Sequence, residues 1–429
     1  MSADRGTPAL ARPADLHLHR WNDRAVLALA IAAFASGFAQ FGVVAALGDV
    51  AKEFGQAGHG DTLAEQAGLS GTALGIGLAV MRLASLGGLP IAALADRFGR
   101  RQMLLVTTGV GLVLTAVAAA SPGYWWFVII FACGRPLLAA ANQLAQVAAA
   151  EQTASRDRAK AVALIAAGYG TGAGTIAIGH SLASRLLGFR GVFLVALIPL
   201  LLLPLLRRWM EEPGRYEVAH VAATHPVPVF GAVGRAYRAR LAVVAGLAFA
   251  VAVVTGPANS FVFLFAQNDL HQQGIIVAAM VAGAGVAGLA GLLTGRWLAD
   301  RVGRRTTGMM AMTAMALFAV LAYSGSASGL LSGYILEVFS AAVFAPAIGA
   351  ISVELFPTSV RASVGGWYLA ASALGAVVGL LVFGAVAGSG QRYGVAGVIT
   401  FLPVILAVAL FRLVPETRGR EPEDLWPAV

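Results

Sequence analysis

The sequence predicts an all-α integral membrane protein with twelve transmembrane helices in two pseudo-symmetric six-helix bundles. Three observations support this fold class. Apolar residues make up 58% of the 429 residues and charged residues only 12%, whereas soluble proteins average about 25% charged residues. The apolar residues also fall in blocks of about 18 or more, long enough to cross ~30 Å of hydrocarbon as a helix. Finally, one short charged motif occurs once in each half of the chain.

The apolar blocks are expected to be helices because every backbone polar group in hydrocarbon needs a partner within its own segment. Membrane strands would be about half as long and would alternate in polarity. The chain also contains 52 glycines, many within the blocks, and small residues there allow helices to pack closely. The predicted segments are 24–48, 69–94, 103–121, 124–150, 159–184, 190–207, 241–266, 274–298, 306–326, 329–353, 362–388 and 394–413.

Basic residues divide unequally between the two sides of the predicted bundle. Of the 30 Lys and Arg, 23 fall on the side of the two termini, 4 fall on the other side, and 3 lie within segments. Because cytoplasmic loops are enriched in Lys and Arg, both termini are predicted to be cytoplasmic in a multi-pass protein of the plasma (inner) membrane. Topology then accounts for the net charge of +9, and no nucleic-acid partner is expected.

The longest predicted cytoplasmic connection lies between the sixth and seventh segments and contains three prolines and several glycines. It is the natural joint between two halves. The predicted organisation is a tail at 1–23, a bundle at 24–207, a linker at 208–240, a second bundle at 241–413 and a tail at 414–429.

The charged motif reads Asp96-Arg97-Phe98-Gly99-Arg100-Arg101 in the first half and Asp300-Arg301-Val302-Gly303-Arg304-Arg305 in the second, 204 positions later. A second pair of motifs is 203 positions apart, with Glu151 and Arg158 matching Glu354 and Arg361. Two motifs with nearly the same offset indicate an internal duplication, which is typical of transporters.

These motifs resemble those of the Major Facilitator Superfamily of membrane transporters. The Asp96 motif is similar to the family's motif between helices 2 and 3. The stretch from Glu354 to Arg361 resembles the end of helix 10 in the sugar-porter and metabolite–proton symporter branches, and Pro415-Glu-Thr-Arg-Gly419 resembles a motif after helix 12. The resemblance implies a monomer in the lipid bilayer, with a central cavity that alternates between the two sides and binds a small-molecule solute and protons.

The resemblance also implies that the charged turns form a cytoplasmic gate. Asp96 can accept bonds from arginines and from the N-terminus of a neighbouring helix such as 362–388, and Glu151 and Arg158 can add ion pairs that break on opening. Alternatively, the arginines only fix topology. The predicted gate residues are Asp96, Arg97, Gly99, Arg100, Arg101, Glu151, Arg158, Asp300, Arg301, Arg304, Arg305, Glu354 and Arg361.

The chain departs from the family pattern at three positions. Four residues before the motif's Asp, where the family usually has Gly, stand Ala92 and Arg296; the bulky Arg296 predicts a looser second copy. In the first segment, Gln40 follows Gly37-Phe38-Ala39, where proton-coupled relatives often carry an Asp. This absence argues against proton coupling at that position.

Ionisable side chains at membrane depth are the candidates for transport chemistry, because charge there is costly and usually faces a cavity or a partner. Arg135 and Glu337 lie 202 positions apart, at nearly equivalent places in the two halves. A carboxyl group in a partly dry cavity can take up and release a proton, so Glu337 is the leading proton-coupling candidate and Asp49 the second. Two alternatives stay open: Glu337 and Arg135 form a permanent pair, and Asp49 is an ordinary acid at the outer end of the first segment.

Polar side chains in several segments are predicted to bind the solute. Arg135, Asn142 and Gln146 share one helix face, and Arg82 either meets an anionic solute or lies against backbone carbonyls. His180 is expected to be a packing histidine. The predicted solute-binding residues are Gln40, Arg82, Arg135, Asn142, Gln146, Tyr169, Asn259, Tyr334 and Tyr368.

The predicted function is a secondary active transporter that moves a small metabolite, an organic acid or a sugar-like solute, with proton coupling. The alternatives are a proton-antiport exporter of drugs or metabolites, a facilitative uniporter, and a non-transporting sensor on the same fold. No enzyme activity or cofactor is expected, because the sequence has no Gly-rich phosphate loop followed by Lys. No His or Cys cluster has the spacing of a metal site.

Overall fold

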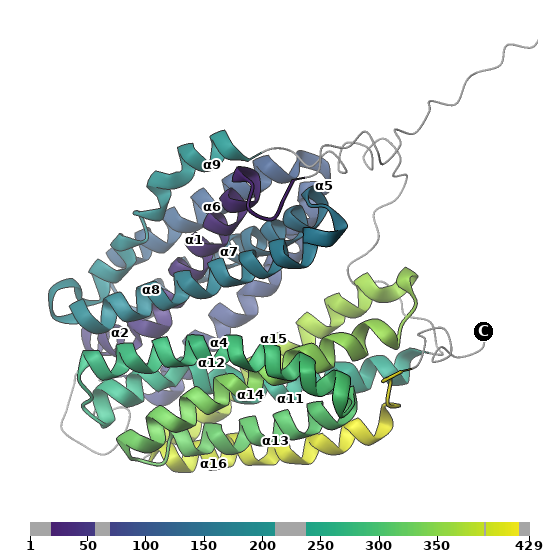
Figure 1. Ribbon diagram of the computed structural model, residues 1–429. Coiled ribbons are helices and arrows are strands. Elements are labelled where there is room, and N and C mark those ends of the chain that lie inside the picture. The colour runs from purple at the N-terminus through teal and green to yellow at the C-terminus, as the bar shows by residue number, and fades with distance from the viewer. Residues whose placement is uncertain (1–18, 56–68, 211–236, 390–391, 420–429) are drawn as a thin grey trace, which may run out of the picture.

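A computed structural model describes residues 19–55, 69–210, 237–389 and 392–419. These parts of the chain are almost entirely helical (Figure 1), and twelve of their helices are long and apolar enough to cross a membrane. Each of the twelve predicted segments corresponds to one of these spans, with ends that differ by a few residues. The linker and both tails lie mostly outside the described residues.

The first half runs from α1 to α9. Its second span is built from three short helices, and α8 carries the fifth span and begins the sixth beyond Gly188, where φ is 53°. The helices are α1 (Arg24–Ala45), α2 (Leu47–Phe54), α4 (Gly71–Ala84), η2 (Ser85–Gly87), α5 (Gly88–Phe98), α6 (Arg100–Val117), η3 (Ala118–Ala120), α7 (Tyr124–Gln152), α8 (Ser155–Val195), η4 (Pro199–Leu202) and α9 (Leu203–Trp209).

The second half runs from α11 to η7 and repeats this order of spans. Its helices are α11 (Arg238–Leu264), η6 (Phe265–Asp269), α12 (Gly274–Arg301), α13 (Arg304–Ala322), α14 (Ala327–Glu354), α15 (Thr358–Gly388), α16 (Tyr393–Phe401) and η7 (Leu402–Leu413).

The repeated charged motif forms the same tight turn in both halves. Gly99 separates α5 from α6 with φ of 90°, and Gly303 separates α12 from α13 with φ of 110°. Residues other than glycine rarely adopt these backbone angles, so the glycine in each copy permits the sharp reversal. The motif therefore sets where the second span of each half ends and where the third span begins.

Within each half, glycines of the fifth span allow it to pack closely against the first span. In the first half, Gly168 and Gly172 of α8 lie against backbone carbonyls of α1. In the second, Gly375 and Gly379 of α15 lie against backbone carbonyls of α11. A β-carbon at any of these positions would collide with the neighbouring backbone, so the glycines are required by the packing.

The two halves meet through α4 with α15 and through α8 with α12. A β-carbon added to Gly75 of α4 would lie 2.6 Å from the Leu380 carbonyl oxygen of α15. Likewise, the Ser181 carbonyl of α8 packs directly on Gly274, the first residue of α12. These contacts lie at one end of the spans, which we call the far end.

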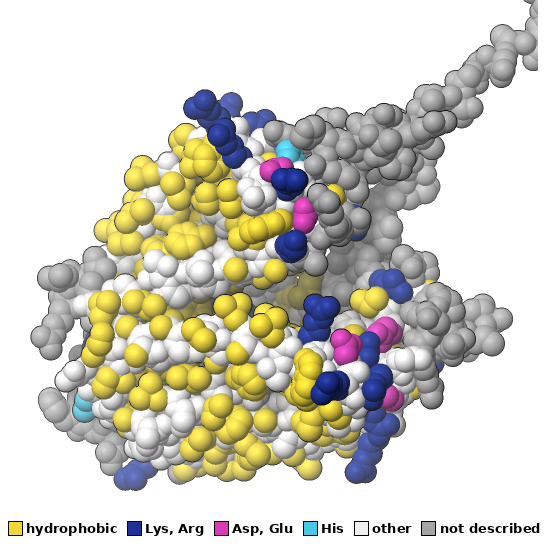
Figure 2. Space-filling model, viewed as in Figure 1, with side chains coloured by type: hydrophobic (Ala, Val, Ile, Leu, Met, Phe, Trp, Pro, Cys, Tyr) yellow, Lys and Arg dark blue, Asp and Glu magenta, His cyan; other side chains and the backbone are white. Residues whose placement is uncertain are grey.

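The opposite end carries Gly99, Glu151, Gly303 and Glu354, and we call it the charged end. In Figure 1 the halves lie together at the left, near α2, and diverge towards the right, where α5 ends. Figure 2 shows a hollow between the halves at the charged end, with Lys, Arg, Asp and Glu side chains on both rims. The structure is thus closed at the far end and open at the charged end.

Much of the remaining surface in Figure 2 is apolar. Exposed side chains such as Leu201 (78%), Leu293 (73%) and Leu406 (79%) lie on the outer faces of the spans. Isolated apolar residues are common on soluble proteins, but bands of them along twelve helices need hydrocarbon around them. The fold is that of a multi-pass membrane protein.

Candidate functional site

A cavity of about 270 Å³ lies between the two halves, near the middle of the spans. Both halves contribute to its wall, so a movement of one half against the other changes its shape. The lining residues are Gln40, Phe41, Val44, Leu78, Arg82, Arg135, Tyr169 and Ala173 from the first half, and Thr255, Gly256, Asn259, Ser260 and Leu380 from the second.

Arg135 is held firmly in this wall. Its Nε donates a hydrogen bond of 2.9 Å to the Ser85 hydroxyl oxygen, which comes from the short η2 turn inside the second span. Its guanidinium group also lies 6.0 Å from the centre of the Phe131 ring, one turn earlier on α7. These two contacts leave the remaining guanidinium N–H groups for the cavity.

Arg82 lies in the same cavity, close enough to Arg135 for the two charges to repel each other. In the part of the chain that the structure describes, neither arginine forms an ion pair with a carboxylate. Tyr169 is the other polar group beside Arg135. The first-half side of the cavity therefore carries uncompensated positive charge.

The second-half side of the cavity is polar and uncharged. Asn259 Nδ2 donates to the Thr255 carbonyl at 2.9 Å, and the Ser260 hydroxyl donates to the Gly256 carbonyl at 2.7 Å. Each side chain is thereby oriented by the backbone one turn earlier on α11. Across the cavity, Gln40 Nε2 donates to the Ser36 hydroxyl oxygen at 2.8 Å. This arrangement offers hydrogen bonds of fixed direction to a bound solute.

Glu337 lies on α14, behind the second-half wall, and is only 1% exposed. Its carboxyl oxygens are shielded from solvent. Asn259, which lines the cavity, is the polar side chain that lies beside it. The permanent Glu337–Arg135 pair left open by the sequence does not form, because no ion pair joins these residues.

At the charged end, the repeated motifs are joined within each half. Arg100 pairs with Glu151 at 2.9 Å, and the equivalent Arg304 pairs with Glu354 at 3.4 Å. Glu151 and Glu354 thus each form an ion pair with an arginine of the charged motif in their own half. Arg361 instead donates to the Val353 and Phe356 carbonyls that end α14.

Comparison with known proteins identifies the family. A sequence model described as Major Facilitator Superfamily matches residues 29–297 and 241–427. The chain belongs to the Major Facilitator Superfamily. A relative from Haemophilus influenzae, named as a metabolite transport protein, is 25% identical over 350 residues, which cover 78% of this chain and 84% of the relative. Another from Cupriavidus pinatubonensis, named as a 4-methylmuconolactone transporter, is 26% identical over 383 residues, covering 84% and 86%.

Solved structures of the superfamily share the fold. The xylose transporter XylE from E. coli, in an inward-open conformation, matches with a TM-score of 0.67 and 19% identity, covering 93% of this chain and 98% of that one. The nucleoside transporter NupG matches with a TM-score of 0.72 and 15% identity, covering 91% and 99%. The family match makes the chain a transporter and not an enzyme, and these solved structures show that it shares the superfamily's fold.

The transporter's cavity brings together five of the nine predicted solute-binding residues: Gln40, Arg82, Arg135, Tyr169 and Asn259. The structure also adds Thr255 to the wall and gives Ser85 a role in holding Arg135. A Thr one turn before Asn259 is a weak pattern that sequence reasoning could have used. Nothing in the sequence distinguishes Ser85 from other small residues of the second span.

The other four predicted residues do not line the cavity. Asn142 and Gln146 are half-buried on α7, two and three turns beyond Arg135 towards the charged end. Tyr334 is buried near Glu337 behind the wall, and Tyr368 packs against the large apolar core. Depth along α7 separates Asn142 and Gln146 from the cavity, whereas the rotation of α14 and α15, which spacing alone does not fix, separates Tyr334 and Tyr368 from it.

The gate that the sequence predicts at the charged end stays a prediction, because the halves are apart there in this conformation. Among the described residues, the Arg100–Glu151, Arg304–Asp300 and Arg304–Glu354 ion pairs each lie within one half, and they are present while the charged end is open. Arg301 lies 4.8 Å from the Trp297 ring on its own helix. The Asp96 side chain lies outside the described residues, and its predicted bond to another helix stays a prediction.

The expected looseness around Arg296 finds no support in the packing. Arg296 is exposed, whereas Gly295 and Gly291 of α12 lie against backbone carbonyls of α14. The small residues that allow close approach stand one and five positions before Arg296. The second copy therefore packs tightly despite the arginine.

A histidine–aspartate pair at the far end was not foreseen. His180 Nε2 of α8 lies 2.7 Å from Asp49 Oδ2 of α2, and His180 is fully buried. The pair stands where the halves meet, since the adjacent Ser181 packs on Gly274. His180 is therefore more than the packing histidine that the sequence suggested, and Asp49 is no isolated surface acid.

Proposed function

We propose that this transporter carries a small organic anion across the plasma membrane by alternating access, coupled to protons. The observation that carries the proposal is the pair Arg82 and Arg135, which share one cavity without a carboxylate partner among the described residues. A guanidinium group binds a carboxylate through parallel hydrogen bonds. An anionic solute would supply the missing negative charge between the two side chains.

The size and polarity of the cavity support a compact solute. Its volume of about 270 Å³ is at the lower limit of typical small-molecule pockets. Phe41, Val44, Leu78 and Leu380 offer an apolar surface, and Asn259 and Ser260 offer neutral hydrogen-bonding groups. The names of the two relatives, which specify a metabolite and a lactone, agree with a small organic cargo.

The orientation follows from the distribution of basic residues. We place the charged end in the cytoplasm, because cytoplasmic loops are enriched in Lys and Arg. Both termini then lie in the cytoplasm and the described conformation faces inward. Alternating access would close the charged end and open the far end around the same cavity.

Glu337 is our candidate for proton coupling. It is buried, and the Asn259 side chain, which lines the cavity, lies beside its carboxyl group. A carboxyl group placed there can exchange a proton with the cavity when solute occupancy changes. Asp49, paired with His180 at the far end, is the second candidate because that contact lies where the halves must separate.

Arg82→Gln tests the anion site in proteoliposomes, with uptake measured for a panel of carboxylates and neutral sugars. We expect the KM for the transported carboxylate to rise roughly 10- to 150-fold, because a hydrogen bond to a charged group contributes about 1.5–3 kcal/mol. Arg296→Gln is the control, since this exposed arginine also lies within a span but outside the cavity. Equal effects of the two changes, or uptake of neutral sugars alone, would overturn the proposed anion site.

Glu337→Gln tests the coupling in the same vesicles with and without an imposed pH gradient. We expect the variant to exchange labelled for unlabelled solute but to lose accumulation driven by the gradient, because glutamine keeps the shape of the side chain and cannot release a proton. Asp49→Asn is measured in parallel to distinguish the two candidates. Gradient-driven accumulation by Glu337→Gln would exclude Glu337 as the coupling site. In the wild type, solute movement in the same direction as the proton gradient indicates symport, and movement in the opposite direction indicates antiport.

A further inference from the structure

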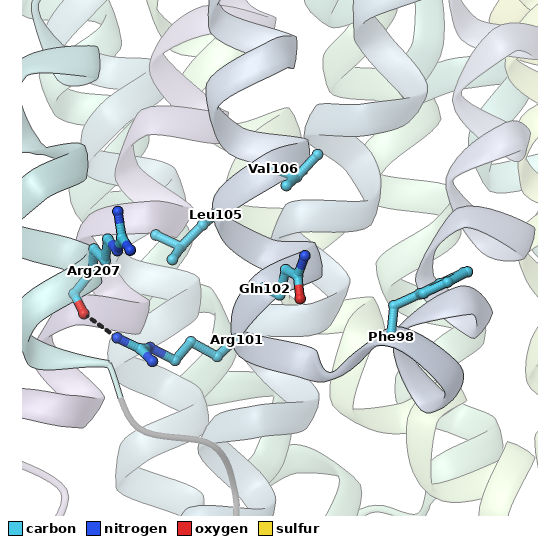
Figure 3. Close-up of a pocket in the computed structure, with 6 residues that line it drawn as sticks. All are labelled: Phe98, Arg101, Gln102, Leu105, Val106 and Arg207. Carbon is cyan, nitrogen blue, oxygen red and sulfur yellow. Dashed lines mark hydrogen bonds between the residues drawn. The ribbon is translucent and has the colours of Figure 1, made fainter.

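A second hollow lies on the outside of the first half, at the charged end (Figure 3). It has a volume of about 560 Å³ and sits between the start of α6 and the end of α9. We call it the α6–α9 pocket. Its lining residues are Phe98, Arg101, Gln102, Leu105, Val106 and Arg207.

Two guanidinium groups stand on the α9 side of this pocket (Figure 3). Arg101 donates a hydrogen bond to the carbonyl oxygen of Arg207, in the last turn of α9. This bond ties the start of α6 to the end of α9 and fixes the spacing of the two residues. Arg207 uses only its backbone in this bond, and its exposed side chain remains in the pocket.

Apart from Gln102, the remainder of the α6–α9 pocket is apolar, and this apolar surface continues along the outer face of α6. Val106 lines the pocket and is 49% exposed, and Val110, Val113 and Val117 follow at helical spacing with 45%, 42% and 46% exposure. The opposite face of α6 is buried within the first half. The valine row is thus the face that hydrocarbon covers, and the pocket lies at its polar end.

We infer that the α6–α9 pocket binds the headgroup of an anionic phospholipid. Arg101 and Arg207 match the charge and the hydrogen-bonding pattern of a phosphate group, and basic pockets between helices at the cytoplasmic side suit acidic headgroups. An acyl chain of the same lipid would lie along the valine row. The occupant is a lipid and not a soluble phosphate because charged and apolar surfaces meet at the depth of the headgroups.

The corresponding turn of the second half is already occupied by a carboxylate, so we expect the lipid site in the first half alone. At the corresponding turn, the backbone N–H groups of Arg304 and Arg305 donate to the Glu416 carboxylate at 2.9 and 3.1 Å. A carboxylate of the chain itself already occupies this place, where it would repel a phosphate. We therefore expect one tightly held anionic lipid for each chain.

Native mass spectrometry of the purified full-length protein tests the inference. The probes are phosphatidylglycerol and phosphatidylcholine with identical acyl chains, added to delipidated protein in detergent. We expect one phosphatidylglycerol to be retained about tenfold more than phosphatidylcholine, since each arginine near the headgroup region favours an acidic lipid. Arg207→Gln should reduce that preference about fivefold, and Arg207→Lys should largely restore it.

Arg208→Gln is the matched control, because Arg208 is the next residue of α9, is also exposed and lines a different pocket. Its preference should stay within about twofold of the wild type. The double change of Arg101 and Arg207 to Gln should abolish the preference, whereas Arg207→Gln alone leaves the bond between α6 and α9 intact. An equal loss in the Arg207 and Arg208 variants, or no preference in the wild type, would overturn the inference. Displacement by millimolar inorganic phosphate would show a soluble-anion site and also overturn it.

Discussion

Arg135 shows how a charged side chain is fixed at membrane depth. Its Nε is bonded to the Ser85 hydroxyl at 2.9 Å, and its guanidinium lies 6.0 Å from the Phe131 ring centre. Arg82, by contrast, is exposed and has no such bond among the described residues. One arginine of the pair is therefore oriented in advance, and the other is free to close on the solute.

Ser85→Ala is expected to weaken solute binding without removing a charge. The lost hydrogen bond contributes about 0.5–1.5 kcal/mol, so the dissociation constant should rise roughly 2- to 13-fold. Titration calorimetry with the transported anion measures this change. Ser332→Ala is the control, because the exposed Ser332 bonds only to its own helix, at the Ser328 carbonyl. A similar loss in both variants would show that the effect is not specific to Arg135.

At the scale of a helix, Glu416, which follows the last span, caps the N-terminus of the earlier helix α13. Its carboxylate accepts hydrogen bonds from the first two backbone N–H groups of α13, which otherwise have no partner within the helix. The negative charge also suits the positive end of the helix dipole. The motif around Glu416 was noted in the sequence, but its partner, more than a hundred positions away, was not.

Glu416→Gln is expected to loosen the first turn of α13. Loss of a capping carboxylate costs about 1 kcal/mol, so amide hydrogens there should exchange about fivefold faster. Hydrogen–deuterium exchange with mass spectrometry measures this rate. The first turn of α6 serves as the internal reference, and Glu416→Asp separates charge from reach. Unchanged exchange in α13 with both variants would contradict the capping role.

At the scale of the whole molecule, closure at the far end is what holds the halves together in this conformation. The contacts of α4 with α15 and of α8 with α12 depend on glycine at the points of closest approach. A β-carbon on Gly388 of α15 would lie 3.0 Å from the Thr72 hydroxyl oxygen of α4. These two positions are close enough for a disulfide.

Thr72→Cys combined with Gly388→Cys, in a Cys133→Ser background, is expected to lock the far end shut. Oxidation should abolish uptake by at least about tenfold, because transport needs the far end to open, and a reductant should restore it. Each single cysteine variant controls for the substitution itself. Normal uptake by protein shown to be fully cross-linked would mean that the far end does not open during transport.

The twelve spans could be predicted because hydrocarbon leaves the backbone few choices. Apolar length alone decides that 24–48 or 274–298 is a helix, and the structure confirms each span within a few residues. The internal repeat could also be predicted, because the residues of the Arg100–Glu151 and Arg304–Glu354 pairs belong to motifs that recur at nearly the same distance along the chain. The cavity was only half predicted, since Asn142 and Gln146 share a face with Arg135 but lie beyond the wall.

The sequence by itself thus determined the spans, the two-fold duplication and the family of this protein, because these depend on length, polarity and local motifs. Only the tertiary structure decided that Arg82 and Arg135 share one cavity, that Glu337 lies beside Asn259, and that Asp49 meets His180. Those relations depend on the rotation and tilt of helices that are distant in the chain. Packing against neighbouring helices sets rotation and tilt, and hydrophobic length does not encode them.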